Sequence, residues 1–281
     1  MRIIDIHTHT FPERIASAAL EELQNASGSK AHTDGTNTGL KKSMQESGID
    51  VSIVLPVVTN PVKASSMNNY AARQNESFEE TGIFSIGGIH PETPDIRGVL
   101  EEARDLGLRG IKLHPDYYGV MFNDIRIKRI IDIASELGLF IITHAGMDIG
   151  LYPPICCTID AIEDVIDDVH PEKLILAHMG GWMNWEEVTR RLYDAPVYVD
   201  TAFSIGEIVW LNDETEKPYH QMSDDMFRTM VKAFGADKII FGTDCPWAEQ
   251  KDYVDRMNAM GLSDNELELI FHKNAEKILG L

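Results

Sequence analysis

Short runs of β-branched and other apolar residues recur along the chain, and segments with helical spacing of apolar residues separate them. This alternation is typical of βαβ units, whose strands pair in parallel. The predicted strands are residues 3–7, 51–56, 84–90, 110–114, 140–144, 173–178, 197–200 and 238–244. Eight strand–helix units in one chain favour an α/β fold of the (β/α)8 TIM-barrel type over an open doubly wound sheet.

Several of the intervening segments also carry the residues that begin a helix. Residues 123–138 place apolar side chains at helical spacing and end in glycine. A further helix is predicted to begin at Asn184, with Glu187 three positions later, which is a capping-box pattern. The same pattern, Ser263 with Glu266, predicts an amphipathic helix that closes the chain.

Two stretches interrupt the alternation. Residues 24–39 are polar and rich in turn formers, and residues 201–221 are irregular. They predict long loops after the first and seventh strands, at the end of the barrel where lids and substrate walls lie. We find no internal repeat or linker, so we expect residues 1–281 to form a single domain, a length compatible with one barrel.

Residues that bind metals well stand at the ends of five of the predicted strands. They are His7 and His9, His114, His144, His178 and Asp244. The carboxyl ends of barrel strands meet in one ring, where the active sites of such barrels lie. Because side chains two positions apart on a strand share a side, we expect both His7 and His9 to point into the barrel mouth. Imidazole and carboxylate ligands suit zinc or a similar divalent ion with one position left for water.

The motifs around these residues resemble the amidohydrolase superfamily, and in particular its amidohydrolase-related branch, which includes ring-acid decarboxylases and lactonases. The matching motifs are "DIHTH", "GIKLHPDYYG", "ITHAG", "LAHMGGW" and "IIFGTDCPW", in the family's order over nearly the whole chain. The resemblance implies that His7, His9, His144 and Asp244 hold a catalytic divalent metal. It also implies that Asp244 carries protons and that His178 lies beside the metal-bound water or binds a second ion.

These residues suggest a hydrolytic mechanism. Zinc lowers the pKa of a bound water to about 7, Asp244 would take its proton during attack on a carbonyl carbon, and His178 would stabilise the oxyanion. We expect one ion rather than two, zinc first and manganese as the alternative. The predicted substrate is a small carboxylated or lactone-like molecule. The second hypothesis is non-oxidative decarboxylation of a ring acid, which needs a cationic anchor such as Arg109 or Lys112.

Lys112 and His114 have more than one interpretation. A carboxylated Lys112 would bridge two ions, whereas an unmodified Lys112 would neutralise nearby carboxylates or contact a substrate anion. We favour the unmodified lysine. His114 would contact substrate at the rim of the pocket or have a structural role.

Composition narrows the classes further. The formal net charge of −20 disfavours nucleic-acid binding, and with it a nuclease. No apolar run is long enough to cross a membrane, and the first residues enter a strand without a targeting signal. The three cysteines do not have the spacing of a disulfide framework or zinc knuckle. We therefore expect a cytoplasmic enzyme with a small-molecule substrate. A homodimer is the oligomeric state that the resemblance suggests.

Overall fold

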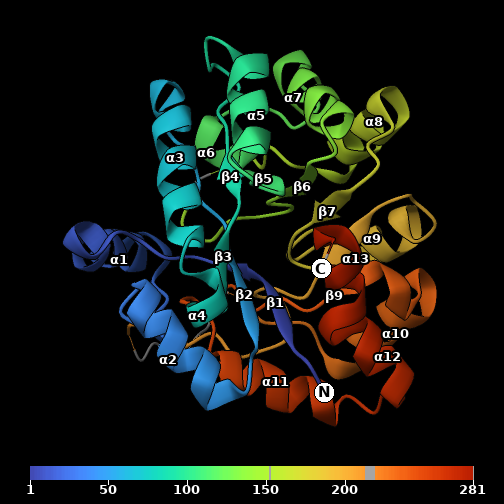
Figure 1. Cartoon of the computed structure of the whole chain (residues 1–281). Helices are drawn as coiled ribbons and strands as arrows, with labels where there is room; N and C mark the ends of the chain where they lie inside the picture. The colour runs from blue at the N-terminus through green and yellow to red at the C-terminus, as the bar shows by residue number, and fades with distance from the viewer. Residues whose placement is uncertain (152, 213–218, 281) are drawn as a thin grey trace.

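In the computed structural model, which describes residues 1–151, 153–212 and 219–280, parallel strands surrounded by helices follow one another in chain order (Figure 1). The strands are β1 Ile4–Thr8, β2 Val51–Val54, β3 Ile83–Ser85, β4 Gly87–Gly88, β5 Gly110–Leu113, β6 Phe140–Thr143, β7 Leu174–Leu176, β8 Tyr198–Asp200 and β9 Ile239–Ile240. Strands β3 and β4 are two parts of the predicted strand 84–90, interrupted at Ile86. Every predicted strand is therefore confirmed, although most are shorter than predicted.

Hydrogen bonds between the first strand and the residues after the last strand close the barrel. The Ile6 amide donates to the Phe241 carbonyl oxygen at 2.9 Å, and the Asp244 amide donates to the His7 carbonyl oxygen at 2.8 Å. Thr8 and Cys245 also form a parallel bridge. The remaining neighbours pair in parallel along β1-β2-β3 and along β4 to β9. The arrangement is the predicted TIM barrel.

Helices connect the strands and cover the barrel. They are α1 Glu13–Ser27, α2 Asn37–Ser47, η1 Pro61–Lys63, α3 Ala64–Asn75, α4 Phe78–Thr81, α5 Ile96–Asp105, α6 Pro115–Tyr118, α7 Ile125–Glu136, α8 Ile159–Val169, α9 Trp185–Leu192, α10 Asp224–Phe234, η2 Ala236–Lys238, α11 Gln250–Ala259, α12 Asp264–Glu268, the π-helical turn η3 Leu269–Lys273, and α13 Asn274–Leu279. Among the described residues, none of these helices is long and apolar enough to cross a membrane.

The capping predictions have different outcomes. The Ser263–Glu266 capping box is present at the start of α12. The predicted box at Asn184 is wrong: α9 begins after this residue, but the Asn184 side chain makes no capping hydrogen bond. Its backbone, at φ −121° and ψ 22°, is outside the extended region in which an N-cap side chain reaches back to the helix.

The loop predicted for residues 24–39 is shorter than expected. Helix α1 projects from the side of the barrel and extends to Ser27, where Gly28 ends it in the left-handed conformation at φ 71° (Figure 1). The irregular connection is thus residues 28–36. It meets the second predicted loop at an antiparallel bridge between Ser29 and Trp210. Part of that second loop, residues 213–218, lies outside the described residues.

The two largest apolar clusters lie on opposite faces of the strands, and a small third cluster contains Ala71, Ala103 and Leu108. Phe140 and Ile142 of β6 belong to a cluster that also contains Ile278 and Leu279 of α13, whereas Ile141 between them belongs to the larger cluster with the surrounding helices. The cluster that contains Phe140 and Ile142 therefore fills the interior of the barrel, and α13 covers one end of the barrel (Figure 1).

The same end of the barrel holds Arg109, which is therefore no candidate for the substrate anchor. Its guanidinium donates to the carbonyl oxygens of Leu279 and Gly280 and lies over the Phe84 ring, 5.7 Å from the centroid. These partners lie at the amino-terminal end of the strands, opposite the predicted site. Of the two anchors that the decarboxylation hypothesis offered, Arg109 is excluded because this side chain holds the end of α13 to the barrel, and Lys112 remains.

The packing of α13 predicts a large effect of Ile278→Ala. Ile278 is 5% exposed, so the truncation leaves a cavity and should lower the free energy of unfolding by about 2–5 kcal/mol. Ile15→Ala removes the same atoms from a residue that is 45% exposed and should change it by about 0.5 kcal/mol or less. Denaturant unfolding of both variants measures the difference, and equal effects would contradict the role of α13 in the core.

Candidate metal centre and active site

His7, at the end of β1, and His9, just after it, converge on the Asp244 carboxylate. The Nε2 atoms of His7 and His9 lie 3.4 Å and 3.1 Å from Asp244 Oδ1. His9 Nδ1 donates to the Leu55 carbonyl oxygen at 2.9 Å, because a carbonyl oxygen can only accept. In neutral His9 the Nε2 lone pair then faces a carboxylate oxygen. Two acceptors at this distance are stabilised by a cation between them, so these side chains fit a metal ion.

A chain of hydrogen bonds prepares His144 in the same way. His178 Nδ1 donates to the Ala202 carbonyl oxygen at 2.9 Å, which leaves Nε2 of the neutral ring as an acceptor. His144 Nδ1 lies 3.0 Å from that atom and donates to it. His144 Nε2 is then an acceptor, and it is buried without a hydrogen-bond partner. A buried acceptor without a partner is costly unless a cation satisfies it.

The metal-binding atoms form two neighbouring groups. Within each group the atoms lie within 4.8 Å of one another: His7, His178 and Asp244 in the first, and His114, His144 and Asp148 in the second. Of the predicted ligands, the structure brings His7, His9 and Asp244 together. His144 belongs to the second group, and its hydrogen bond to His178 connects the two.

Lys112 of β5 lies inside the barrel beside this site. It is 1% exposed, and its Nζ atom is 3.3 Å from His7 Nε2. Burial lowers the pKa of Lys112 to about 8, and the charges of Asp200 and Asp244 oppose that shift. This environment agrees with the interpretation of Lys112 as an unmodified interior lysine that neutralises nearby carboxylates.

His114 follows β5 and stacks on His144, with 4.3 Å between the ring centroids. Its Nε2 atom lies 3.2 Å from Asp148 Oδ2, and its ring meets that of Tyr117 edge to face. His114 therefore lies in the site, in contact with a second predicted site histidine.

The histidine rings are held in the form that binds metals. Burial, and next to it the charge of Lys112, sets the pKa of His7 and His114 well below the ordinary value. Burial followed by His114 does the same for the pKa of His144. These rings are neutral near pH 7, and a neutral imidazole has a nitrogen lone pair available for a metal ion.

The sequence prediction missed Asp200, the last residue of β8. Asp200 is fully buried, and its Oδ2 accepts a hydrogen bond from His7 Nδ1 at 2.8 Å. Burial raises the pKa of Asp200 to about 7. The missed signal was its position: Asp200 ends the predicted strand 197–200, just as the predicted ligands end theirs.

Asp5 has a different role from these residues. Its carboxylate accepts hydrogen bonds from the amide and hydroxyl of Thr243, from the Gln250 side chain and from the His7 amide. These bonds attach β1 to the connection between β9 and α11, next to a shift in the β1–β2 register between Asp5 and Thr8. Asp5 thus fixes the strand end that carries His7.

Several site residues have strained backbones. His178, Met179 and Asp244 adopt φ angles of 60°, 55° and 72°, in the left-handed region that non-glycine residues rarely adopt. Such strain persists only where surrounding contacts hold it, and it is common at functional sites.

A cavity of about 1400 Å³ opens onto the site. Its inner part is lined by His9, Lys112, His114, His144, His178 and Asp244 together with Tyr117, Trp182 and Trp247. Its outer part lies between α1 and α3, where Ile15, Leu23, Met67 and Tyr70 form apolar walls. Lys63 and Arg73 also line this part, and neither forms an ion pair within the described part of the chain. The cavity is larger than the roughly 300–1,000 Å³ of most small-molecule pockets.

Comparison with known proteins identifies the family. Residues 4–281 match the sequence model of the Amidohydrolase family. The chain belongs to this family, a group of metal-dependent enzymes of the amidohydrolase superfamily, and the predicted resemblance is confirmed. A search of curated proteins finds no significant match to the chain.

Solved structures share the fold. A TIM-barrel protein from Bordetella bronchiseptica has a TM-score of 0.76 at 18% identity, covering 100% of this chain and 99% of its own. A 2,6-dihydroxybenzoate decarboxylase from Rhizobium has a TM-score of 0.71 at 14% identity, covering 100% and 99%. A dihydroxybenzoic acid decarboxylase from Polaromonas, with bound manganese and 2-nitroresorcinol, has a TM-score of 0.71 at 15% identity, covering 100% and 97%.

The site predicts that a divalent ion stabilises the folded protein. Zinc or manganese at about one hundred times its dissociation constant should raise the free energy of unfolding of chelator-treated protein by about 2.7 kcal/mol. Asp244→Asn should abolish most of this gain, because the carboxylate that faces both ring nitrogens is lost. Asp255→Asn, which removes a carboxylate paired with Lys251 on the surface of α11, is the control and should retain it. A wild-type protein that gains no stability from either ion would contradict the metal site.

Proposed function

We propose that the protein is a metal-dependent hydrolase that acts on a C–O or C–N bond of a small carboxylated or lactone-like molecule. The observation that carries this proposal is the convergence of His7 Nε2 and His9 Nε2 on Asp244 Oδ1, with His178 in the same group of donor atoms. The arrangement places a carboxylate and an imidazole, the common proton carriers of hydrolases, beside two further metal-binding nitrogens.

His7, His9 and Asp244, together with His144 from the neighbouring group of donor atoms, would hold one divalent ion, zinc first and manganese as the alternative. When bound, such an ion polarises a carbonyl group and lowers the pKa of a water molecule to about 7. Manganese is the ion named with the Polaromonas decarboxylase. A second ion would use His114 and Asp148, and two equivalents of metal per chain would replace the one-ion proposal.

The side chains themselves move the protons. The Asp244 carboxylate accepts a proton from the water molecule that attacks the carbonyl carbon, and it returns this proton to the leaving group. His178 Nδ1 donates to Ala202 and His178 Nε2 accepts from His144 Nδ1 at 3.0 Å, so Nε2 holds a proton toward the oxyanion only after the ring takes up a second proton and releases the bond from His144. Trp182, Trp247 and Tyr117 at the cavity wall reduce the access of bulk water to this reaction.

The cavity lining carries both signs of charge, with Arg14, Lys63, Arg73 and Lys112 against Glu13, Glu22, Asp148 and Asp244. The whole chain has a formal net charge of −20, but α3 and the turn before it present Lys63 and Arg73 to the cavity. Lys112 adds a buried ammonium group at the inner end. A substrate carboxylate would bind at one of these basic side chains, and Arg73 and Lys63 are candidates because neither forms an ion pair within the described part of the chain. The proposal also includes a cytoplasmic location and a homodimer, as expected from the sequence.

Non-oxidative decarboxylation of a ring acid is the second candidate. Lys112 supports it, because this buried cation lines the cavity and could anchor the carboxylate that leaves. The decarboxylases with the same fold act on dihydroxybenzoates, as their names state. We still place hydrolysis first for two reasons. The negative charges of Asp200 and Asp244 already compensate the positive charge of Lys112, and Arg109, the other candidate anchor, lies at the other end of the barrel.

Removal of either proton carrier should slow the reaction. Asp244→Asn and His178→Asn should each lower kcat by about 10²–10⁴-fold on a true substrate, since each removes a group that transfers or holds a proton. Acid release from a lactone panel measures hydrolysis, and ultraviolet absorbance of aromatic acids measures decarboxylation. Wild-type kcat in His178→Asn would exclude the role given to that residue. Turnover of aromatic acids without turnover of lactones would select the second candidate.

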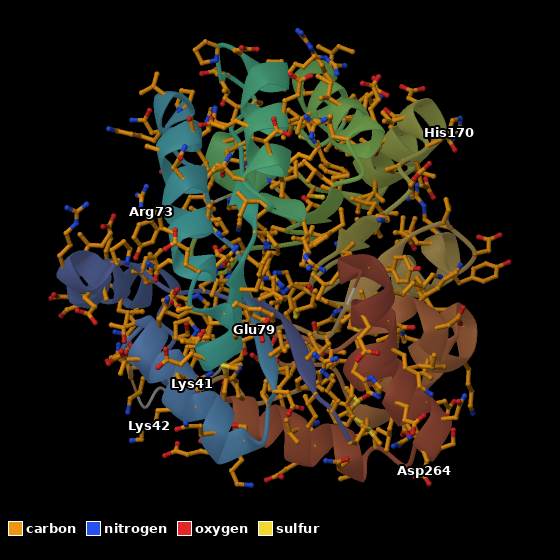
Figure 2. All side chains as sticks on the ribbon, in the orientation of Figure 1. Lys41, Lys42, Arg73, Glu79, His170 and Asp264 are labelled. Atoms are coloured by element: carbon orange, nitrogen blue, oxygen red, sulfur yellow. The ribbon has the colours of Figure 1, made fainter. Side chains whose placement is uncertain are left out.

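Charge reversal at the outer cavity should change substrate binding. Arg73→Glu should raise KM for a carboxylated substrate by about tenfold, the effect of losing about 1.4 kcal/mol of binding free energy, with kcat nearly unchanged. Lys42→Glu makes the same change of net charge on α2, where Lys42 is outside the cavity lining, and is the control (Figure 2). An equal effect of both variants on KM would contradict a local role of Arg73, because the change in net charge alone would then explain the result.

A further inference from the structure

Asp200 connects two residues of the proposed active site through different oxygen atoms. Its Oδ2 accepts from His7 Nδ1 at 2.8 Å, and its Oδ1 accepts from the amides of His178 and Ala202 at 2.9 Å and 3.1 Å. Its side chain has no exposure to solvent. All these partners are therefore protein groups, and water cannot replace them.

The bond to Oδ2 determines which nitrogen of His7 carries the proton. The ionised form of Asp200 only accepts, so in that form His7 Nδ1 is the donor and Nε2 of the neutral ring has the lone pair. The environment of Nε2 agrees with this tautomer, because Lys112 Nζ, which only donates, lies 3.3 Å away. Nε2 is also the atom that faces Asp244.

The two hydrogen bonds to Oδ1 fix the backbone and the ring of His178. One bond holds its amide directly, where the backbone is in the left-handed region at φ 60°. The other holds the amide of Ala202, whose carbonyl oxygen accepts from His178 Nδ1. Both the strained backbone and the ring of His178 thus depend on the position of one carboxylate.

We propose that Asp200 is a positioning residue that keeps His7 in the metal-binding tautomer and orients His178 toward the substrate. This inference rests on the proposed function, since it assigns His7 to the metal. Carboxylates that accept from the second nitrogen of a metal-binding histidine are a general means of fixing the ring, and their loss costs about 10–100-fold in metal affinity.

Asp200→Asn tests the proposal with little change of shape. The two amides at Oδ1 require the remaining oxygen of the asparagine, so its NH₂ group faces His7 Nδ1. That nitrogen must then accept, the proton moves to Nε2, and His7 loses the lone pair that faces Asp244. We expect the affinity for zinc, measured by competition with a chelator, to fall by about 10–100-fold.

Thr201→Val is the matched control for a purely structural effect. Thr201 is the next residue, it is fully buried, and its hydroxyl donates to the Gly242 carbonyl oxygen at 2.7 Å and accepts from the Gly242 amide at 3.0 Å. The substitution removes two buried hydrogen bonds beside β8 and touches neither His7 nor His178. It should lower stability while zinc affinity stays within about twofold of wild type, well below the loss expected at Asp200.

The ¹⁵N spectrum of the histidine rings in metal-free protein supplies a readout that needs neither metal nor activity. In the wild type and in Thr201→Val, the His7 signals should be those of a ring protonated at Nδ1, and in Asp200→Asn those of a ring protonated at Nε2. An unchanged tautomer in Asp200→Asn, or equal losses of zinc affinity in both variants, would overturn the proposal. A wild type that binds no metal would defeat the proposed function, while the spectra would still decide the role of Asp200.

Discussion

The hydrogen bond from the Asp244 amide to the His7 carbonyl oxygen is the contact on which the rest of the site depends. It joins the end of the last strand to the first strand, so the same bond closes the barrel and places the Asp244 carboxylate beside the two β1 histidines. Asp5 strengthens this junction by accepting hydrogen bonds from Thr243. Closure of the barrel thus also brings together the side chains that we propose as metal ligands.

Buried charges form the second constraint. Lys112, Asp200 and Asp244 lie within one barrel mouth. Burial penalises the charged forms of Lys112 and Asp200, and the opposite charges of these two groups compensate one another. The cost of this arrangement is met by the apolar interior below it, where Ile142 and Phe140 fill the barrel down to α13. A chain that needed only stability would not bury these groups, which is why their presence points to chemistry.

The cavity relates the site to a class of substrate. Its inner end contains the proposed proton carriers and metal ligands, and its outer end contains apolar walls with Lys63 and Arg73. The fold is shared with decarboxylases of hydroxylated benzoic acids, and the family is named for hydrolysis. Both proposed reactions use a divalent ion and a group that carries a proton, so the choice between them depends on the bonds of the substrate.

Much of this protein could be predicted from its sequence. Apolar periodicity predicted every strand, because a buried parallel strand needs a continuous apolar run. The strand-end positions of the histidines predicted that these side chains meet, because parallel strands end on one ring, and their roles stay a prediction. Local patterns were less reliable: Ser263 caps its helix, but Asn184 does not, since the preceding turn sets its backbone. Only the tertiary structure placed Arg109 at the opposite end of the barrel, grouped His144 with His114 and Asp148, and brought Asp200 to the His7 ring. These facts depend on which atom of a side chain faces which neighbour, and residue spacing along a chain determines the face of a strand but not the partner across the barrel.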